Sequence, residues 1–483
     1  MTGSILLPSS IRRHEHAKWI SSVVALAVVA VVTGRLASAG PSFRLALAGC
    51  LLLVTLGIWA LRPTALLYLL VVWTVVLGGV RRLVSYEVGF SAGSDPLLLV
   101  APFAVVLLAG EALWAGASRR RTRLSQGVLV LAVLIGLGAL NPLQGSPKAG
   151  VASLIFFVPV AAFWAGRRLD DATLRRVLTL AALLVIPAAL YGLAQLVYGF
   201  PRWDAEWINV QGYAALNVGG VIRQFSSFSS ASEYAALLAI GVVLWAWLRP
   251  GGAPRILGFL VLPLLLVSLF YESARGIIFA IVATVGLLLA AGRRVRLPVA
   301  AVFAAGMLVL LPVVVSPFVP VTDPRATGVG ALVSHQVSGL SDPTGSRSTL
   351  PGHVRLVLSG LTSAFTNPVG RGISTVTIAG SKFGGQGGST EADPSNVAIA
   401  LGLPGLLVYL LIVWQGFTGA YRLAVMRRSA LAFAVLGLLS VTFAQWLNGG
   451  QYAVAYLPWL VLGWVDRNAQ ELEREADGSV SSE

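Results

Sequence analysis

Apolar runs long enough to cross a membrane recur along almost the whole chain. A transmembrane helix needs about 20 mostly apolar residues, with a range of about 17–25, and it must satisfy its own backbone hydrogen bonds because lipid supplies no water. The candidate segments are residues 19–38, 45–61, 63–80, 96–116, 124–143, 150–166, 177–197, 233–248, 256–272, 276–292, 297–318, 397–419, 429–447 and 451–465. The sequence therefore predicts an all-α bundle of about fourteen transmembrane helices, formed by residues 1–483 as a single polytopic domain in a lipid bilayer.

The composition excludes a soluble protein, because 56% of the residues are hydrophobic and only 11% are charged, whereas a soluble domain has about 25% charged residues. The net charge of +15 does not indicate a nucleic-acid partner, because most basic residues stand in short clusters beside apolar runs. The single cysteine, Cys50, lies inside an apolar run and gives no disulfide framework. No cleavage-site pattern precedes the first apolar run, so we expect that run to be retained as a span.

The basic clusters predict the orientation of the chain. With both termini in the cytoplasm, fourteen spans place nearly every cluster on the cytoplasmic side, as the positive-inside rule requires. The clusters are Arg119, Arg120, Arg121 and Arg123; Arg167, Arg168, Arg175 and Arg176; Arg249 and Arg255; Arg293, Arg294 and Arg296; and Arg422, Arg427 and Arg428. Arg81 and Arg82 fall on the outer side, so they are either tolerated there or a sign that the first three spans are misplaced. The polar tail, residues 466–483, is predicted to be cytoplasmic and frayed.

The outer face receives the one long polar interval of the chain, residues 316–396. Loops held by a rigid scaffold often carry function, although a disordered spacer is the alternative. Within the loop, the stretch GHVRLVLSGLTSAF predicts an amphipathic helix along the membrane surface, with Leu356, Leu361, Ala364 and Phe365 on one face.

Two arginines stand at the outer ends of spans, where a charge is costly unless it is paired or used. Arg223 lies in VIRQFSSFSSASEY and Arg275 lies in YESARG. The alternatives to a functional role are contact with lipid headgroups or a salt bridge with Glu272 or Glu233. A guanidinium presents five donors in a plane and stays charged, so both arginines are suited to binding a phosphate or diphosphate.

The long loop also carries titratable candidates. His353 has a side chain that titrates near physiological pH, so it is a candidate general base, with a surface or helix-capping role as the alternative. The acidic pairs Asp204/Glu206 and Glu391/Asp393 could act as bases or bind a cation. Exposed carboxylates are the commoner case, so we expect these acids to be solvated loop residues.

The stretch NPVGRGIS places Arg371 between Gly370 and Gly372, which permit a tight turn and a close approach of the backbone to a ligand. It has neither the spacing nor the context of a nucleotide-binding loop. No cluster of His, Cys, Asp and Glu has metal-ligand spacing, and no serine stands in a nucleophile elbow. We therefore expect neither a metal nor a cofactor.

Four stretches between residues 217 and 415 occur in an order that resembles the O-antigen ligase and O-antigen polymerase superfamily of bacterial membrane proteins. They are VIRQFSSFSSASEYAALLA, ESARGIIFAIV, HVRLVLSGLTSAFTNPVGRGIS and PSNVAIALGLPGLLVYLLIVW. The resemblance implies metal-independent glycosyl transfer on the outer face of the bacterial plasma membrane, from a glycan carried on polyprenyl diphosphate to a glycan or lipid acceptor. It implies that Arg223 and Arg275 hold the diphosphate, with Arg355 as the loop arginine.

The chain departs from that family at one place. Ligases of the superfamily usually carry a histidine in the doublet before the last Gly-x-x-Gly span, where this chain has Ser395 and Asn396. Either His353 or one of the acids Asp393 and Glu391 serves as the base, or the protein is a polymerase-like relative rather than a ligase. Of the two activities, the polymerase is slightly favoured. Gly370, Arg371, Gly372 and Asn396 are expected to border the acceptor.

Two other functions compete with this prediction. A lipid-linked polysaccharide flippase would have many spans too, but such transporters are usually built from two similar halves with polar helices at mid-membrane. No repeat is visible here, and Glu111 is the clearest acid inside a span. A glycosyltransferase with an acidic motif in its first external loop is disfavoured, because residues 35–44 contain no acid.

Overall fold

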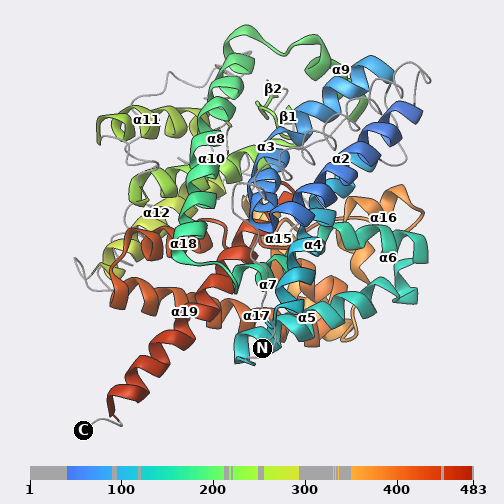
Figure 1. The fold of residues 1–483 in the computed structure, drawn as a ribbon. Coiled ribbons are helices and arrows are strands. Elements are labelled where there is room, and N and C mark those ends of the chain that lie inside the picture. Colours follow the sequence, from blue (N-terminus) through green and yellow to red (C-terminus); the bar gives the residue numbers. More distant parts are fainter. Residues whose placement is uncertain are drawn as a thin grey trace, which may run out of the picture.

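The computed structural model describes residues 41–89, 95–117, 121–211, 217–218, 221–248, 255–272, 274–292, 350–447 and 451–480, together with residues 330, 332 and 336. This part of the chain is helical nearly throughout (Figure 1). Two short strands, β1 (Asn217–Val218) and β2 (Val221–Ile222), pair antiparallel with Asn217 opposite Ile222.

The helices follow one another with short connections. The α-helices are α2 (Pro41–Leu61), α3 (Pro63–Val88), α4 (Val100–Trp114), α5 (Arg123–Ala139), α6 (Pro147–Ser153), α7 (Ala162–Gly166), α8 (Asp171–Tyr198), α9 (Arg202–Gln211), α10 (Ala231–Trp247), α11 (Arg255–Glu272), α12 (Arg275–Ala291), α15 (Leu350–Thr366), α16 (Ile378–Lys382), α17 (Asp393–Arg427), α18 (Ala430–Val441) and α19 (Tyr456–Val480). The 3-10 helices are η1 (Pro96–Leu99), η2 (Pro142–Gln144), η3 (Leu154–Phe156), η4 (Val158–Ala161) and η7 (Ile373–Val376).

The prediction of an all-α, membrane-compatible bundle is confirmed for the described residues. Five helices in this part are long and apolar enough to cross a membrane: Ser42–Leu61, Pro63–Val88, Pro96–Trp114, Asp171–Tyr198 and Asp393–Arg427. Shorter apolar helices coincide with other predicted spans, at Arg123–Ala139, Ala231–Trp247, Ile256–Glu272, Arg275–Ala291 and Ala430–Val441. The predicted spans 19–38 and 297–318 lie outside the described residues, and the total of fourteen stays a prediction.

Several predicted boundaries need correction. The predicted span 150–166 is broken into two helical segments, Pro147–Phe156 and Val158–Gly166, that meet at 46°. Pro159 lacks a backbone N–H and follows the break directly, which explains why a straight helix does not continue there. The tail after Asp466, predicted to fray, continues α19 as a helix to Val480.

The segments that carry basic clusters meet at one end of the bundle. Arg167 forms an ion pair with Asp466 at 2.9 Å, and Thr122 Oγ1 donates to the same carboxylate at 2.7 Å. Trp464 Nε1 donates to Asp171 at 2.9 Å, and the Arg427 guanidinium lies 3.6 Å from the Asp171 carboxylate. We call this the basic end. Its assembly agrees with the prediction that the clusters near Arg123, Arg167 and Arg427 share one side. For the other two clusters, and for which side faces the cytoplasm, the prediction is not tested.

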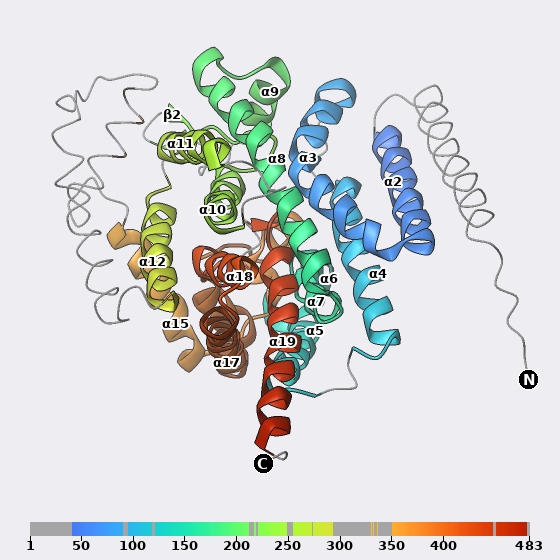
Figure 2. The same cartoon turned by 60° about the vertical axis from the view of Figure 1, so that its left-hand side comes forward.

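Hydrogen bonds also join connections outside the basic end, including the long loop predicted on the outer face. Gln386 N donates to Gln144 O at 3.4 Å, which joins the long loop to the turn before α6. The turn before α10 is joined to α3 by a 2.8 Å hydrogen bond from Arg81 to Ser229. In Figure 2, α8, α10 and α19 lie in the middle of the molecule, with α2, α3 and α4 on one side and α11, α12 and α15 on the other.

Glycines let helix backbones touch where the bundle is tightest. A methyl group at Gly166 of α7 would overlap the backbone of Leu460 in α19, and one at Gly463 would overlap the backbone of Phe163. Small residues at such crossings give close van der Waals packing, which is a main source of helix association in membranes. The contact fixes α19 in the centre of the molecule.

Candidate functional site

Arg223 lies directly after β2 and reaches the end of α11. Its Nε donates to the backbone oxygen of Glu272 at 2.8 Å, and its Nη2 forms an ion pair with the Glu272 carboxylate. The Arg223 side chain keeps 13% of its surface exposed, whereas the Glu272 side chain is fully buried. The predicted alternative, a salt bridge between Arg223 and Glu272, is therefore present in the structure. The ion pair holds the guanidinium of Arg223 in a fixed position at the end of α11.

Arg275 is the first residue of α12, just beyond the end of α11. It is half-buried and close enough to Arg223 for the two positive charges to repel each other. The short connection between α11 and α12 thus brings two guanidinium groups together, although the residues are far apart in the sequence.

His353 and Glu391 form a pair at the same end. The Nδ1 atom of His353, in the first turn of α15, lies 2.8 Å from a carboxylate oxygen of Glu391, which precedes α17. The charge of Arg275 acts on His353 and that of Arg223 acts on Glu391. Arg223, Arg275, His353 and Glu391 therefore form one group, which we call the four-residue cluster.

The pair has opposite effects on its two members. The hydrogen bond to Glu391 raises the pKa of His353 above its ordinary value of 6.5, while burial and the charge of Arg275 act to lower it. The hydrogen bond from His353 lowers the pKa of Glu391 below its ordinary value of 4.5, while burial acts to raise it. A carboxylate on Nδ1 favours the tautomer with its proton there, which leaves Nε2 able to accept a proton.

The backbone around Glu391 is held in an unusual conformation. Glu391 has a φ of 66°, a left-handed geometry that is strained for a non-glycine residue. Gln445 donates to the Glu391 carbonyl oxygen at 2.7 Å. Asn396 accepts from the backbone N–H of Thr390 at 2.9 Å and donates to Ser389 at 3.2 Å. Asn396, predicted to border the acceptor, thus braces the turn that presents Glu391.

Asp393 has a different environment from Glu391. Its carboxylate is fully buried and accepts from Tyr409 Oη at 2.8 Å, from Leu447 N at 2.9 Å and from Trp446 N. This carboxylate thus binds groups of α17 and of the segment after α18, and it has no surface exposed to solvent. Of the three predicted base candidates, the buried Asp393 therefore stabilises the fold, whereas the side chains of His353 and Glu391 are exposed.

Asp204 and Glu206, the other acidic pair, also differ in their surroundings. Asp204 was expected to be a solvated loop acid, and this is wrong: its side chain is fully buried in an ion pair with Arg82 at 2.6 Å, and it accepts from Tyr191 and Gln195 at 2.7 Å. Glu206, two residues on, is exposed as expected. Since Arg82 requires a partner for its buried charge, Asp204 supplies it.

Arg355 lies on α15 two residues after His353, and its side chain is exposed. Among the described residues, no hydrogen bond or ion pair joins Arg355 to the four-residue cluster. The structure thus brings together two of the three arginines predicted to bind a diphosphate.

Gly370 and Gly372 take positive φ values of 74° and 94°, and their close approach is to protein rather than to a ligand. A methyl group at Gly370 would overlap the backbone of Ala400. The backbone N–H groups of Arg371 and Gly372 donate to the carbonyls of Ile399 and Ala400, at 2.8 and 2.9 Å. The turn is thereby locked onto α17 where non-helical Gly402 (φ 67°) interrupts that helix.

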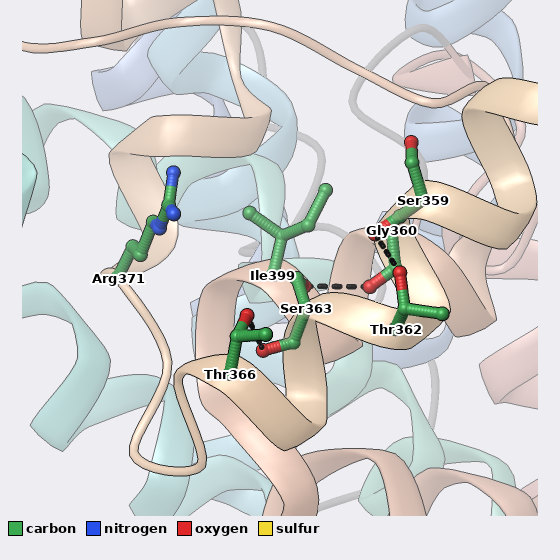
Figure 3. A pocket seen from close by; sticks show the side chains of 7 residues that line it. All are labelled: Ser359, Gly360, Thr362, Ser363, Thr366, Arg371 and Ile399. Carbon is green, nitrogen blue, oxygen red and sulfur yellow. Dashed lines mark hydrogen bonds between the residues drawn. The ribbon is translucent and has the colours of Figure 1, made fainter.

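A pocket of about 320 Å³ opens between this turn and α15. It is lined by Ser359, Gly360, Thr362, Ser363, Thr366, Arg371 and Ile399. Figure 3 shows Arg371 on one side and the hydroxyl side chains of α15 on the other, with Ile399 between them. The sequence interpretation missed these hydroxyls, although their spacing along one helix is a readable signal, since residues three and four apart share a helix face.

The part of the chain that the structure describes contains no group of three or more His, Cys, Asp or Glu side chains placed to hold a metal ion. Comparison with protein-family models and with curated proteins finds no match for the chain. The family resemblance of the motifs therefore stays a prediction, and the chemical argument for function depends on the four-residue cluster and the pocket beside it.

Proposed function

We propose that the protein is a membrane glycosyltransferase that moves a glycan from a polyprenyl-diphosphate donor to an acceptor hydroxyl at the outer face of the plasma membrane. Arg223 and Arg275 hold the diphosphate, and His353, paired with Glu391, accepts the proton of the acceptor. The observation that carries the proposal is the convergence of these four residues from separate segments at one end of an apolar helical bundle.

The reaction is a direct displacement at the anomeric carbon. The acceptor oxygen forms a bond to that carbon while the bond from carbon to the diphosphate oxygen breaks. The electron pair of the broken bond leaves with the polyprenyl diphosphate, and the acceptor proton passes to Nε2 of His353. The proton on Nδ1 stays in the hydrogen bond to Glu391, which also stabilises the imidazolium that forms.

The two guanidinium groups act on the leaving group. Negative charge develops on the diphosphate oxygens as the glycosidic bond breaks, and fixed donors aimed at that charge stabilise the transition state. Arg223 is held before substrate binds, because Glu272 anchors its Nε and Nη2 atoms. A fixed donor loses little conformational entropy on binding, so more of the interaction appears as catalysis.

The acceptor decides between two forms of this activity. In a polymerase the acceptor is another lipid-linked glycan, and in a ligase it is a different lipid. We favour the polymerase, because the doublet Ser395–Asn396 lacks the usual ligase histidine, and Asn396 instead braces the turn at Glu391.

The test is turnover of a polyprenyl-diphosphate-linked oligosaccharide by the purified protein in nanodiscs, with product length followed on gels. We expect His353→Ala, Arg275→Lys and Arg223→Lys to lose about 100-fold or more in rate, as enzymes do when one transition-state donor is removed. Arg223→Lys keeps a positive charge beside Glu272, and both lysine variants lose the planar bidentate geometry of the guanidinium.

Arg202→Ala is the matched control, because Arg202 is an exposed arginine on α9 outside the four-residue cluster. Full turnover by folded His353→Ala and Arg275→Lys would overturn the proposed chemistry. Movement of the lipid-linked glycan across the bilayer without a new glycosidic bond would favour a flippase instead.

A further inference from the structure

The wall that α15 contributes to the pocket beside Arg371 consists of serine and threonine hydroxyl groups. Ser359, Thr362, Ser363 and Thr366 each donate a hydrogen bond to the carbonyl oxygen three residues earlier, at 2.9, 2.9, 2.6 and 3.3 Å. A hydroxyl that donates to the backbone still has lone pairs with which it can accept. The wall formed by α15 is therefore a row of acceptors for the hydroxyl groups of a ligand.

On the opposite side of the pocket, the guanidinium of Arg371 offers hydrogen-bond donors, and the backbone of this residue is held in place. The backbone N–H of Arg371 donates to Ile399 O at 2.8 Å, while its side chain is exposed and lines one side of the pocket (Figure 3). Among the described residues, no hydrogen bond or ion pair occupies the guanidinium of Arg371. The pocket contains no acidic side chain, so it presents a net positive charge. Ile399 gives it an apolar floor.

The helix α15 has three faces with different surroundings, and its hydroxyl face is left uncovered beside the pocket. Gly360 and Ala364 pack against the start of α17, since a methyl group at Gly360 would touch Ser395 and Ile399 and Ala364 is buried with Ala398 and Leu406. A second face is apolar and exposed, as the solvent-accessible side chains of Leu358 and Phe365 show. The hydroxyl face is the third. Of the four apolar residues predicted on one face, Leu361 and Ala364 thus pack inward, while Leu356 and Phe365 are exposed.

The pocket lies farther along α15 than His353. With a rise of 1.5 Å per residue, the hydroxyls from Ser359 to Thr366 lie about 9 to 20 Å from His353 along the helix axis. A sugar in the pocket is therefore not the sugar whose anomeric carbon reacts at the four-residue cluster. It belongs to a more distant part of the glycan chain.

We propose that this pocket binds an acidic sugar of the glycan, with its carboxylate on Arg371, its hydroxyls on the serine and threonine side chains of α15 and its C–H face on Ile399. This inference rests on the proposed function for the identity of the ligand as a glycan. The pocket acts as a recognition subsite remote from the chemistry, and it selects chains whose repeating unit carries a carboxylate.

Binding to the full-length protein in nanodiscs tests the subsite without turnover. The probe is tetragalacturonic acid, with neutral maltotetraose as its counterpart. We expect saturable binding of the acidic probe, a Kd about tenfold or more weaker in Arg371→Ala because a charge-assisted bidentate contact is lost, and a smaller loss in Thr362→Val. Arg202→Ala, an exposed arginine outside the pocket, should bind like the unchanged protein.

Three results would overturn the subsite: no binding of tetragalacturonic acid, equal binding of maltotetraose, or an Arg371→Ala Kd within error of the unchanged protein. Displacement of the probe by an equal concentration of inorganic phosphate would mean a simple anion site and would also overturn it. The two proposals fail separately. Normal probe binding by a protein that forms no glycosidic bond removes the proposed function alone, whereas active protein with no probe binding removes the subsite alone.

Discussion

Arg82 and Asp204 form an ion pair at 2.6 Å in which neither side chain has any exposed surface. Arg82 also donates to the backbone oxygens of Ser226 and Phe228, and its guanidinium lies over the ring of Phe225 at 4.7 Å. The pair joins α3 to α9 and to the loop before α10. That loop continues from Arg223, so Arg82 anchors the segment that follows the proposed diphosphate site.

Arg82→Met should destabilise the protein by about 3–5 kcal/mol, because it leaves the Asp204 carboxylate buried without its partner. Thermal unfolding in detergent measures the loss. Arg202→Met, on an exposed residue of α9, is the control and should leave the melting temperature unchanged. The double variant Arg82→Met/Asp204→Leu should recover part of the loss, since removing both charges removes the desolvation cost. A single variant as stable as the unchanged protein would contradict a structural role for the pair.

Glu391→Gln should shift the pH dependence of turnover. His353 acts as a base only when it is deprotonated, and the hydrogen bond to Glu391 raises its pKa above 6.5. Removing the carboxylate charge lowers that pKa, so the acid limb of the kcat/KM profile should move to lower pH. Glu206→Gln, an exposed acid on α9, should leave the profile in place. An unmoved acid limb in Glu391→Gln would exclude His353 as the titrating base.

The same pair makes only a small contribution to stability, with a defined pH window. The raised pKa of His353 means that its contribution is present below pH 6.5 and is lost as pH rises through the higher folded value. The lowered pKa of Glu391 means that its contribution is present above pH 4.5 and is lost as pH falls through the lower folded value. The stabilisation is therefore largest between these limits, and solvent screens it because the side chains are 44% and 63% exposed.

Asp393→Ala should reduce stability rather than change the chemistry. It removes the Oδ2 atom that accepts from Tyr409 and Leu447, and each unsatisfied buried donor costs about 1–3 kcal/mol. We expect a lower melting temperature with an unchanged pH profile of turnover at low temperature. A shifted profile would instead place Asp393 among the reacting groups.

Gly463→Ala should weaken the contact between α7 and α19. Its added methyl group would overlap the backbone of Phe163, and overpacking of this kind costs about 1–3 kcal/mol. Gly136→Ala is the matched control, because nothing lies within 4 Å of a methyl group at that position in α5. The control should be neutral or slightly stabilising in the same unfolding measurement. Equal melting temperatures for the two variants would mean that the crossing tolerates a side chain.

The features of the fold that depend on local composition could be predicted from the sequence. Apolar runs predicted the helices, and clusters of arginine predicted which segments meet at the basic end. Arg81 and Arg82 did not fit that pattern because their partners are distant in the chain. Arg81 pairs with Asp95 and donates to Ser229, and Arg82 pairs with Asp204. Such partners offset the cost of burying a charge, and no local pattern reveals them.

The candidate site was predicted in part for the same reason. The cost of a charge at the edge of a span pointed to Arg223 and Arg275, and the scarcity of histidine pointed to His353. The different environments of Glu391 and Asp393 depend on the start of α17, where one side chain faces His353 and the other faces Tyr409. Only the backbone path separates two acids that look equivalent in the sequence.

The central position of α19 has a consequence for biosynthesis. Gly463 contacts the backbone of α7, and Asp466 pairs with Arg167 and Thr122. A ribosome makes α19 after every segment against which it packs. Until that helix is released and inserted, Arg167 cannot pair with Asp466, and the face of α7 at Gly166 is not covered by Leu460. A nascent chain that stalls before Tyr456 therefore lacks the contacts that hold α7 in the centre of the bundle.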